Sequence, residues 1–250
     1  MRHDAVLVET IGIRGTDDDE IEAYTARPLD GGRRGGVVVI HHMPGYDWGT
    51  KEIVRRFAVQ GYNAICMNLY SREAPGAAPD DAAATARAQG GVPDARFVGD
   101  AAGAARWLRS LPTSNGKVGT IGFCSGGRQA FLSALELDIQ AAVDCYGAFV
   151  VREMPEGLPF PRMRPIVDLA PQLSCPLLGL FGNEDAHPSP DQVDELEKLL
   201  QTHGKEYEFH RYDDAGHAFF SVDRPAYRVA AAVDGWRRVE AFFAKHLDGE

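Results

Sequence analysis

The sequence has 250 residues, of which 44% are hydrophobic and 25% are charged. This composition is typical of a soluble globular protein and excludes the disordered and fibrous classes. An α/β chain of this length is routinely one unit, so we expect a single domain over residues 1–250. The net charge of −10, from 36 acidic and 26 basic residues, disfavours nucleic acid and anionic membranes as partners.

Segments that would mark a membrane or secreted protein are missing from the sequence pattern. No apolar run approaches the roughly 20 residues that span a bilayer, and the first residues lack the apolar centre of a signal peptide. We therefore expect a cytoplasmic monomer or small homo-oligomer. The four cysteines lack the paired spacing of a zinc site, so reduced thiols are expected.

The predicted elements begin with two strands, residues 5–13 and 21–29, joined by an acidic turn as an antiparallel pair. Buried strands and helices then alternate, which predicts a parallel sheet wrapped by helices. The further strands are expected at residues 37–42, 63–70, 117–124, 140–147, 176–182 and 207–214. The helices are expected at residues 50–61, 94–111, 125–136, 191–204 and 227–247.

Two stretches do not follow this alternation. Residues 74–92 are rich in Ala, Pro and Gly without a core-facing stripe, which predicts a loop or a marginal helix. Residues 152–171 carry five prolines, and either stretch could cover a site. Before the helix at 191–204, Ser189 is the expected N-cap, Pro190 the first helical residue and Gln192 the capping-box partner.

The segment IGFCSGG lies where a predicted strand ends and a helix begins, which is the setting of a hydrolase nucleophile turn. Gly122 and Gly126 flank Cys124 two residues on either side, and such a strained turn leaves no room for side chains at these positions. Ser125 is the rival nucleophile, but Phe123 would then occupy a flanking position. The spacing therefore selects Cys124, whose thiolate the helix N-terminus would favour.

An acid and a base follow two later predicted strands, in the chain order of a hydrolase triad. Glu184 or Asp185 could orient an imidazole, and we select Asp185 as the acid. His217 follows the last predicted strand and is the expected base. His187 is an alternative base, but it lies on the acid's own loop and is expected at the surface.

Together these motifs resemble the dienelactone hydrolase (carboxymethylenebutenolidase) family of α/β hydrolases. The resemblance runs from about Gly36 to the C-terminus through GYNAICMNLYSREAPG, SNGKVGTIGFCSGG, CYG and YDDAGHAFF. It implies an α/β-hydrolase fold, in agreement with the expected antiparallel N-terminal pair and mostly parallel sheet of about eight strands with helices on both faces. It also implies a catalytic triad of Cys124, Asp185 and His217.

An oxyanion hole needs two N–H donors, one just after the nucleophile and one from the loop after the third strand. Ser125 would supply the first donor. The family pattern places the second at Met43, because Pro44 has no N–H. In the same loop, His41 and His42 are adjacent in a strand-end turn and would point to opposite sides, which makes a poor metal pair.

The chain departs from the family pattern around the thiol. The family has a glutamate at the position of His42, and a serine at the position of Ala218. It binds a substrate carboxylate with two arginines, of which Arg87 matches one and Ser221 replaces the other. These departures weaken the case for a small anionic dienelactone as the substrate.

Four aromatic residues favour a more apolar pocket, although each could equally belong to the core: Tyr46, Trp48, Tyr146 and Phe219. Tyr146 belongs to the matched CYG motif and is, with His42 and Arg87, an expected substrate contact. The function predicted is hydrolysis of a small-molecule ester or lactone through an acyl-thioester, without metal or organic cofactor. The alternatives are a non-hydrolytic small-molecule binding protein on the same scaffold and an acyl transferase.

Overall fold

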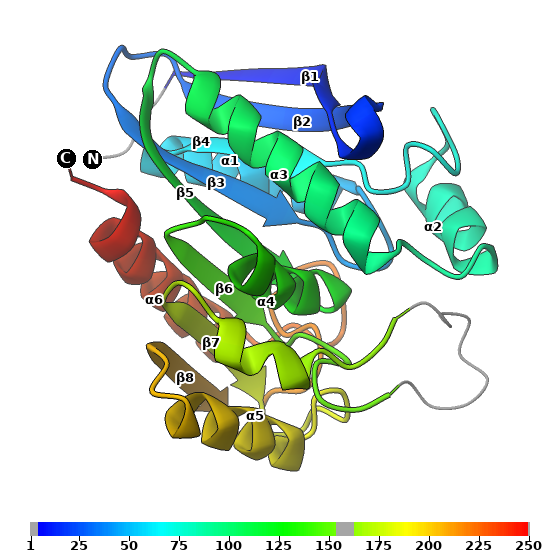
Figure 1. Cartoon of the computed structure of the whole chain (residues 1–250), viewed down its shortest axis with the longest axis vertical. Helices are drawn as coiled ribbons and strands as arrows, with labels where there is room; N and C mark the ends of the chain where they lie inside the picture. The colour runs from blue at the N-terminus through cyan, green and yellow to red at the C-terminus, as the bar shows by residue number, and fades with distance from the viewer. Residues whose placement is uncertain (1–4, 154–162, 250) are drawn as a thin grey trace.

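The computed structural model describes residues 5–153 and 163–249, and contains one mixed sheet flanked by helices (Figure 1). The strands are Val6–Arg14 (β1), Glu20–Pro28 (β2), Arg34–Ile40 (β3), Asn63–Met67 (β4), Ser114–Phe123 (β5), Ala141–Cys145 (β6), Leu177–Gly182 (β7) and Tyr207–Tyr212 (β8). The helices are Trp48–Gln60 (α1), Pro79–Ala88 (α2), Asp94–Ser110 (α3), Ser125–Glu136 (α4), Pro190–Thr202 (α5) and Val229–Leu247 (α6), with short 3-10 helices at Thr16–Asp18 (η1) and Val167–Gln172 (η2).

The eight strands have the order β1-β2-β4-β3-β5-β6-β7-β8. β1 and β2 pair antiparallel, β2 pairs antiparallel with β4, and the remaining pairs are parallel. This confirms the predicted antiparallel pair and mostly parallel sheet. The chain passes from β3 to β4 on one side and then to β5 on the other, so the loops after β3 and β5 meet at a topological switch point, where ligands bind in open α/β sheets.

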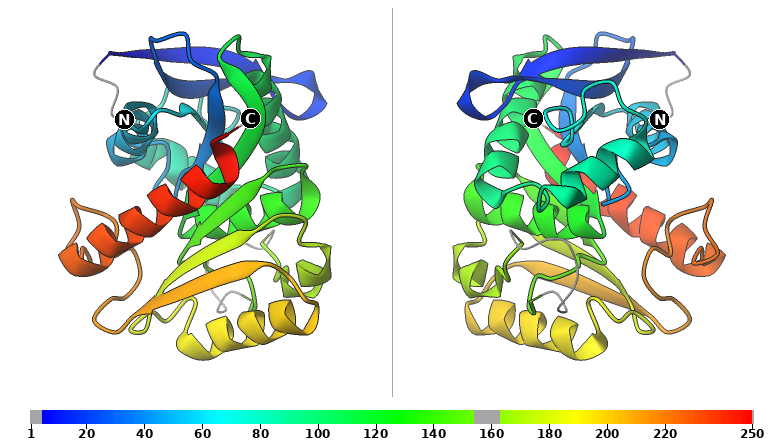
Figure 2. Two further views of the ribbon diagram at one scale, coloured as in Figure 1. Left: turned by 90° about the vertical axis from the view of Figure 1, so that its left-hand side faces the viewer. Right: turned by 90° about the vertical axis from the view of Figure 1, so that its right-hand side faces the viewer.

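The sheet is buried on both faces because successive side chains of each strand alternate between two apolar clusters. In β3, Val38 and Ile40 belong to the cluster that packs under α3, α4 and α5, whereas Val37 and Val39 belong to the cluster under α1 and α6. Figure 2 shows α3 and α6 on opposite sides of the twisted sheet. Helices on both faces were predicted, and this prediction is confirmed.

Residues 74–92 were predicted to be a loop or a marginal helix without a core-facing stripe. The structure has a helix there, α2, but the expected lack of a core-facing stripe was wrong, because Ala82, Ala83 and Ala86 are buried against the core. Alanine stripes carry too little apolar surface to stand out in a sequence pattern, although a helix can bury them closely. Of the Pro-rich stretch 152–171, residues 154–162 lie outside the described residues, and η2 lies within the rest.

The start of α5 differs from the expected capping box. Ser189 is the N-cap and Pro190 the first helical residue, as predicted, but the Ser189 side chain makes no capping bond. Its hydroxyl instead donates to Asp191. The helix is therefore held by the backbone bond from Gln192 N–H to Ser189 O, at 3.0 Å, rather than by the Gln192 side chain.

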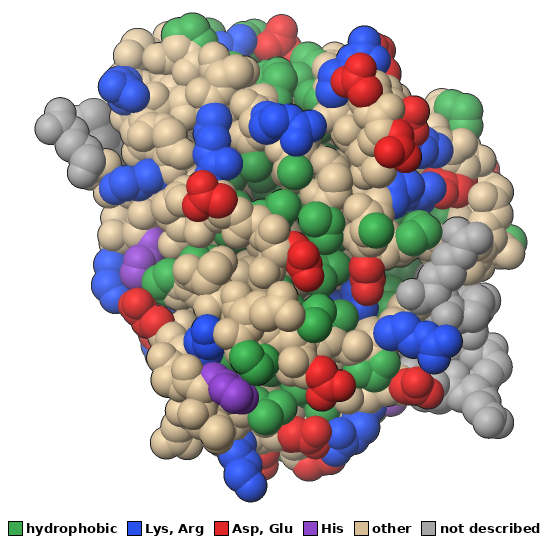
Figure 3. Space-filling model, viewed as in Figure 1, with side chains coloured by type: hydrophobic (Ala, Val, Ile, Leu, Met, Phe, Trp, Pro, Cys, Tyr) green, Lys and Arg blue, Asp and Glu red, His purple; other side chains and the backbone are tan. Residues whose placement is uncertain are grey.

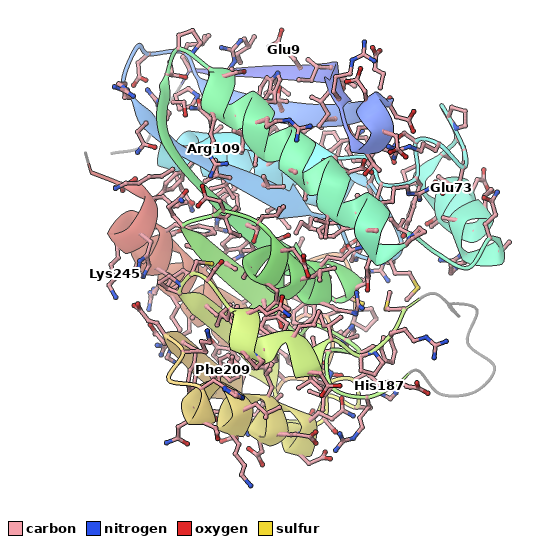
Figure 4. The ribbon with its side chains drawn as sticks, viewed as in Figure 1. Glu9, Glu73, Arg109, His187, Phe209 and Lys245 are labelled. Atoms are coloured by element: carbon pink, nitrogen blue, oxygen red, sulfur yellow. The ribbon has the colours of Figure 1, made fainter. Side chains whose placement is uncertain are left out.

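The parallel strands end at the edge of the molecule that carries the loops after β3, β5 and β7. Figure 4 places Glu73 and His187 at this edge, whereas Arg109 and Lys245, near the ends of α3 and α6, lie at the opposite edge. The face seen in Figure 3 intersperses acidic and basic side chains with hydrophobic ones. Among the described helices, none is both long and apolar enough to cross a bilayer.

Candidate active site

Cys124 lies in the tight turn between β5 and α4. Its backbone has φ 57° and ψ −121°, a left-handed region that a side chain with a Cβ adopts only at a cost of about 1–3 kcal/mol. The turn is fixed by hydrogen bonds from Cys124 N–H to Cys145 O, at 3.1 Å, and from Gly127 N–H to Cys124 O, at 2.9 Å. The thiol is therefore held at the N-terminus of α4 and is half-buried.

The flanking glycines are required by close backbone contacts. A Cβ on Gly122 would collide with the carbonyl oxygen of Gly126, and a Cβ on Gly126 would lie 2.5 Å from the carbonyl oxygen of Ile40. The elbow is thus packed against the end of β3, which brings the loop after β3 beside Cys124. The close approach explains the glycine spacing that selected Cys124 in the sequence.

The structure brings together the three residues of the expected triad. His217 Nδ1–H donates to Asp185 Oδ2 at 2.7 Å, and the Asp185 side chain is only 2% exposed. The other carboxylate oxygen of Asp185 accepts the His187 N–H at 2.8 Å, which fixes the carboxylate. The Cys124 thiol acts on the pKa of His217 and so lies beside the imidazole, and Nε2 is the ring nitrogen that the bond to Asp185 leaves free.

These contacts determine the charge of His217. Burial lowers the pKa of the imidazole, but the hydrogen bond to Asp185 and the neighbouring Cys124 outweigh burial and raise the pKa to about 10. An imidazole with this pKa is protonated at neutral pH.

The two rival residues of the acidic loop have other places. Glu184 is exposed, and its backbone N–H donates to Ala215 O at 2.9 Å. His187 is half-buried rather than a free surface residue, with its ring centroid 5.4 Å from that of Phe149. Of these residues, Asp185 is the one that orients His217.

The two amides expected to form the oxyanion hole, those of Met43 and Ser125, border one small cavity of about 20 Å³. This volume holds about one oxygen-sized group. Within the described residues, neither N–H donates a hydrogen bond to another protein group. Tyr70 O–H donates to Met43 O at 2.8 Å and so fixes the orientation of the Met43 peptide.

His42 is turned toward α1. Its Nε2–H donates to Asp47 Oδ2 at 2.7 Å, while Asp47 Oδ1 accepts from Thr50 N–H at 2.8 Å and caps the helix. Burial raises the pKa of Asp47, but the bonds from His42 and Thr50 outweigh it and hold the pKa well below its ordinary value.

The neighbouring histidine has different partners. His41 Nδ1–H donates to His42 O at 2.8 Å and its Nε2 accepts the Leu69 N–H at 3.2 Å. Burial lowers the pKa of His41 to about 4, so this imidazole is neutral at physiological pH. Its two hydrogen bonds tie the end of β3 to the segment after β4.

Arg87 lies in the last turn of α2, on the Tyr70 side of the nucleophile. Burial raises the pKa of the Tyr70 hydroxyl, the positive charge of Arg87 acts against this rise, and Cys124 adds to it. Both Arg87 and Cys124 are therefore close enough to act on Tyr70. This places the one cation expected to contact substrate on the same side as the Met43 amide.

A cavity of about 370 Å³ lies on the other side, between α1, residues 220–222 and α6. Tyr146 lines it, as predicted, and so does His42. The other three expected pocket aromatics do not: Tyr46 and Phe219 are buried in the core, and Trp48 is 71% exposed. Tyr46 and Phe219 thus take the core positions that were the alternative to pocket lining, because an aromatic residue in a sequence does not reveal which side of a packed layer it faces.

Three comparisons with known proteins bear on this geometry. The family model of the dienelactone hydrolase family matches residues 21–247. The chain is 33% identical over 234 residues to a protein of Salmonella typhimurium named "Putative carboxymethylenebutenolidase", with 91% of this chain and 84% of that protein covered. This chain belongs to the dienelactone hydrolase family.

Two further proteins match nearly all of the chain. A Bradyrhizobium protein named "Probable 2-oxo-3-(5-oxofuran-2-ylidene)propanoate lactonase" is 29% identical over 253 residues, with 100% of this chain and 99% of that protein covered. A crystal structure of a dienelactone hydrolase homologue from Klebsiella pneumoniae superposes with a TM-score of 0.86 at 30% identity and covers 97% of this chain and 100% of its own. The α/β-hydrolase fold that the motifs predicted is confirmed.

Within this dienelactone hydrolase, sequence reasoning missed several residues that shape the site. Tyr70 lies inside a motif used for the resemblance, but only the structure shows its bond to Met43. Asp47 carried a detectable signal, since an aspartate directly before a predicted helix is a favoured N-cap. Phe220 and Trp236 line the larger cavity and had no signal that separates them from ordinary core aromatics.

Proposed function

We propose that this member of the dienelactone hydrolase family cleaves an ester or lactone through Cys124, with His217 as base and Asp185 as its orienting acid. The observation that carries the proposal is a thiol in a strained turn at a helix N-terminus, beside an imidazole that a buried carboxylate holds at 2.7 Å. Nucleophile, base and orienting acid in contact are the arrangement of covalent acyl-transfer catalysis. The family and the lactonase relative support lactone or ester bonds as the target.

The reaction begins from the Cys124 thiolate beside a protonated His217, the pair that results when the thiol proton lies on Nε2 of His217. The sulfur then attacks the carbonyl carbon, and the carbonyl electron pair moves to the oxygen to give a tetrahedral oxyanion. Collapse of this intermediate breaks the bond to the alcohol oxygen, which takes the proton from His217. The product of this half-reaction is an acyl-thioester on Cys124.

Water completes the cycle. His217 removes a proton from a water molecule that attacks the thioester carbonyl, and the second tetrahedral intermediate expels the Cys124 thiolate. The thiolate and the protonated His217 restore the starting pair. Asp185 stays ionised throughout and stabilises the imidazolium.

The amides of Met43 and Ser125 stabilise the oxyanion of both intermediates. Two unpartnered N–H groups beside a cavity of about 20 Å³ support this role. Such donors contribute most when their backbone is fixed before the reaction begins. The Tyr70 bond to Met43 and the start of α4 at Ser125 provide that rigidity.

The proposal is tested with Cys124→Ala and the hydrolysis of p-nitrophenyl butyrate. We expect kcat/KM to fall by at least about 10³-fold, because no other side chain replaces the thiol as the nucleophile. Cys66→Ala is the matched control, since Cys66 is a fully buried thiol in β4. We expect it to keep wild-type kcat/KM.

Two outcomes would contradict the proposal. Turnover that survives Cys124→Ala would show that another group is the nucleophile. Stoichiometric ligand binding by the wild-type protein, with no release of p-nitrophenol, would favour the non-hydrolytic alternative. Circular dichroism of each variant separates loss of activity from loss of fold.

A further inference from the structure

The cavity of about 370 Å³ begins beside the catalytic residues proposed above. Phe123, which lines it, directly precedes Cys124 in the chain. Tyr146, which also lines it, has its ring centroid 5.1 Å from that of His217. Cys124 and His217 do not line the cavity themselves, but two of its wall residues adjoin them, so a group attached to a carbonyl at Cys124 can reach the cavity past Phe123 and Tyr146.

The inner wall of this cavity is aromatic. The ring centroids of Phe123 and Phe220 are 5.7 Å apart, and those of Phe220 and Trp236 are 5.4 Å apart, both edge-to-face. Ile53 lines the side toward α1. Cys124 itself packs against the apolar cluster that contains Phe123 and Phe220, so apolar surface continues from the thiol into the cavity.

The charged residues of the rim disfavour an anion. Asp47 and Glu52 both line the cavity, and Arg56 is the one lysine or arginine among its described lining residues. The Arg56 guanidinium is already engaged, lying 4.0 Å from the ring centroid of Trp236 and 3.1 Å from the carboxylate of Glu240. The two acidic side chains are engaged as well, Asp47 with His42 and Thr50, and Glu52 with Arg55. Among the described lining residues, a substrate carboxylate would therefore find no free lysine or arginine to bind.

Ser221 also makes the cavity less suited to a substrate carboxylate. It lines the cavity where the family pattern has an arginine that binds a substrate carboxylate. It lies close enough to Tyr146, a buried residue, to act on the pKa of the Tyr146 hydroxyl. The cavity therefore keeps the space that a longer cationic side chain would occupy.

The volume fits a substituent of moderate size. A closed apolar cavity of about 150 Å³ accepts benzene, so about 370 Å³ holds an aryl ring with substituents or a chain of six or more carbons. We propose that this cavity binds an uncharged apolar group of the substrate, and that the enzyme prefers uncharged esters or lactones to those carrying a carboxylate. This inference rests on the hydrolysis at Cys124 proposed above.

The first test compares two matched pairs of substrates by kcat/KM. p-Nitrophenyl hexanoate and mono-p-nitrophenyl adipate share a leaving group, and the adipate ester carries a carboxylate at the end of its acyl chain. Phenyl acetate and 4-acetoxybenzoate share an acyl group and differ by a carboxylate on the leaving group. We expect a preference for the uncharged member of at least tenfold in one pair, and that pair identifies which part of the substrate enters the cavity.

The second test changes the aromatic wall. Trp236→Ala is expected to lower kcat/KM for the preferred uncharged ester by about tenfold, mainly through KM, and to leave the charged partner nearly unchanged. Trp48→Ala removes the same side chain at a position that is 71% exposed and outside the cavity lining. We expect it to change neither value by more than twofold.

The third test changes the rim charge and does not depend on the fold of the Trp236 variant. Glu52→Gln is expected to raise kcat/KM for the carboxylate-bearing ester severalfold without changing that for the uncharged ester. Glu195→Gln is the control, because Glu195 is likewise ion-paired on a helix, to Arg152, and does not line the cavity.

The outcomes separate the two proposals. Hydrolysis of the uncharged esters that survives Cys124→Ala would overturn the proposed function. Hydrolysis that needs Cys124 but is equally fast or faster for the charged member of both pairs would overturn only the cavity inference. The cavity inference would also be overturned if the Trp236→Ala and Glu52→Gln variants both kept the wild-type ratio of kcat/KM for the charged ester to kcat/KM for the uncharged ester.

Discussion

Two histidine–aspartate pairs lie around Cys124, and they have the same 2.7 Å hydrogen bond. In one pair His217 uses Nδ1 to donate to Asp185, and in the other His42 uses Nε2 to donate to Asp47. The pairs differ in what surrounds them. The Asp185 side chain is 2% exposed, whereas the Asp47 side chain is 26% exposed and also caps α1.

The use of opposite ring nitrogens decides what each imidazole can do. With Nδ1 bonded to Asp185, His217 presents Nε2 to the thiol, and this contact helps to raise its pKa to about 10. The aspartate of the other pair is fixed by Thr50 and belongs to the start of a helix. A histidine–aspartate pair is therefore a candidate for catalysis only when the free ring nitrogen meets a nucleophile.

Substitutions in the two histidine–aspartate pairs should differ widely in their effect on kcat/KM, and this is the largest difference that we expect. His217→Asn and Asp185→Asn should each lower kcat/KM for an uncharged ester by about 10²–10⁴-fold, because the general base is lost or misoriented. His42→Asn and Asp47→Asn should each lower it by less than about tenfold. Steady-state kinetics at pH 7.5 measures all four; equal losses in the two pairs would refute the distinction.

A third aspartate, Asp144, is buried without an imidazole partner among the described residues, and its pKa is changed in the opposite direction from that of Asp47. Asp144 in β6 is fully buried, its Oδ1 accepts the Gly147 N–H at 2.7 Å, and its Oδ2 has no hydrogen-bond partner among the described residues. Burial raises its pKa to about 7, although the Gly147 bond acts in the opposite direction. The stability contributed by the protonated acid is thus complete below its ordinary pKa near 4 and is lost as pH rises through about 7.

Asp144→Asn should remove this dependence. Between pH 5 and pH 8, the free energy of unfolding of the wild-type protein should fall by about 3 kcal/mol relative to that of the variant. The fall occurs over the two pH units between pH 5 and the Asp144 pKa of about 7, at about 1.4 kcal/mol for each unit. Urea unfolding at both pH values measures the difference. The exposed Asp223→Asn is the control; a wild-type-to-Asp144→Asn difference that is the same at both pH values would contradict the expectation.

The imidazole charges provide a direct spectroscopic comparison. At pH 7, nitrogen NMR should find both nitrogens of His217 protonated, whereas His41, whose pKa is lowered to about 4 by burial, should be neutral. Cys124→Ala should lower the pKa of His217 by more than about one unit, since the thiol partner that raises it is removed. An unchanged His217 titration would show that the thiol does not interact with this imidazole.

The smallest effects concern the helix caps. Asp47→Ala should lower the free energy of unfolding by about 1 kcal/mol, because it removes the cap of α1. Ser189→Ala should lower it by less than about 0.5 kcal/mol, because the Ser189 side chain makes no capping bond at α5. Urea unfolding of both variants tests the contrast, and equal losses would contradict it.

The strands and the elbow could be predicted from the sequence because their signals are local. Continuous apolar runs mark the buried strands, and Gly122 is required by a contact within the turn itself, with Gly126. The contact of Gly126 with Ile40 is not local, but the glycine that it requires stands two residues from Cys124 in the sequence. The helix after the nucleophile was predicted at residues 125–136 and lies there. The expected partners of the thiol, Asp185 and His217, could be chosen because they follow two later strands in the chain order of a hydrolase triad.

The surroundings of the site could not be predicted because they depend on packing between distant segments. Trp48 and Trp236 look alike in the sequence, yet Trp236 lines the cavity and Trp48 is exposed. His42 and Asp47 are five residues apart in a loop, and only the turn of that loop brings them together. The buried alanine face of α2 gave no periodic signal at all.

The account depends most on Cys124 as the nucleophile, and rapid-quench mass spectrometry tests this directly. Wild-type protein is mixed with p-nitrophenyl hexanoate, quenched in acid during the first turnover and digested. We predict a hexanoyl group on the peptide that contains Cys124, at the sulfur by fragmentation, removable by neutral hydroxylamine and formed at least as fast as turnover. A hexanoyl group on Ser125, or turnover without any acylated peptide, would contradict the account.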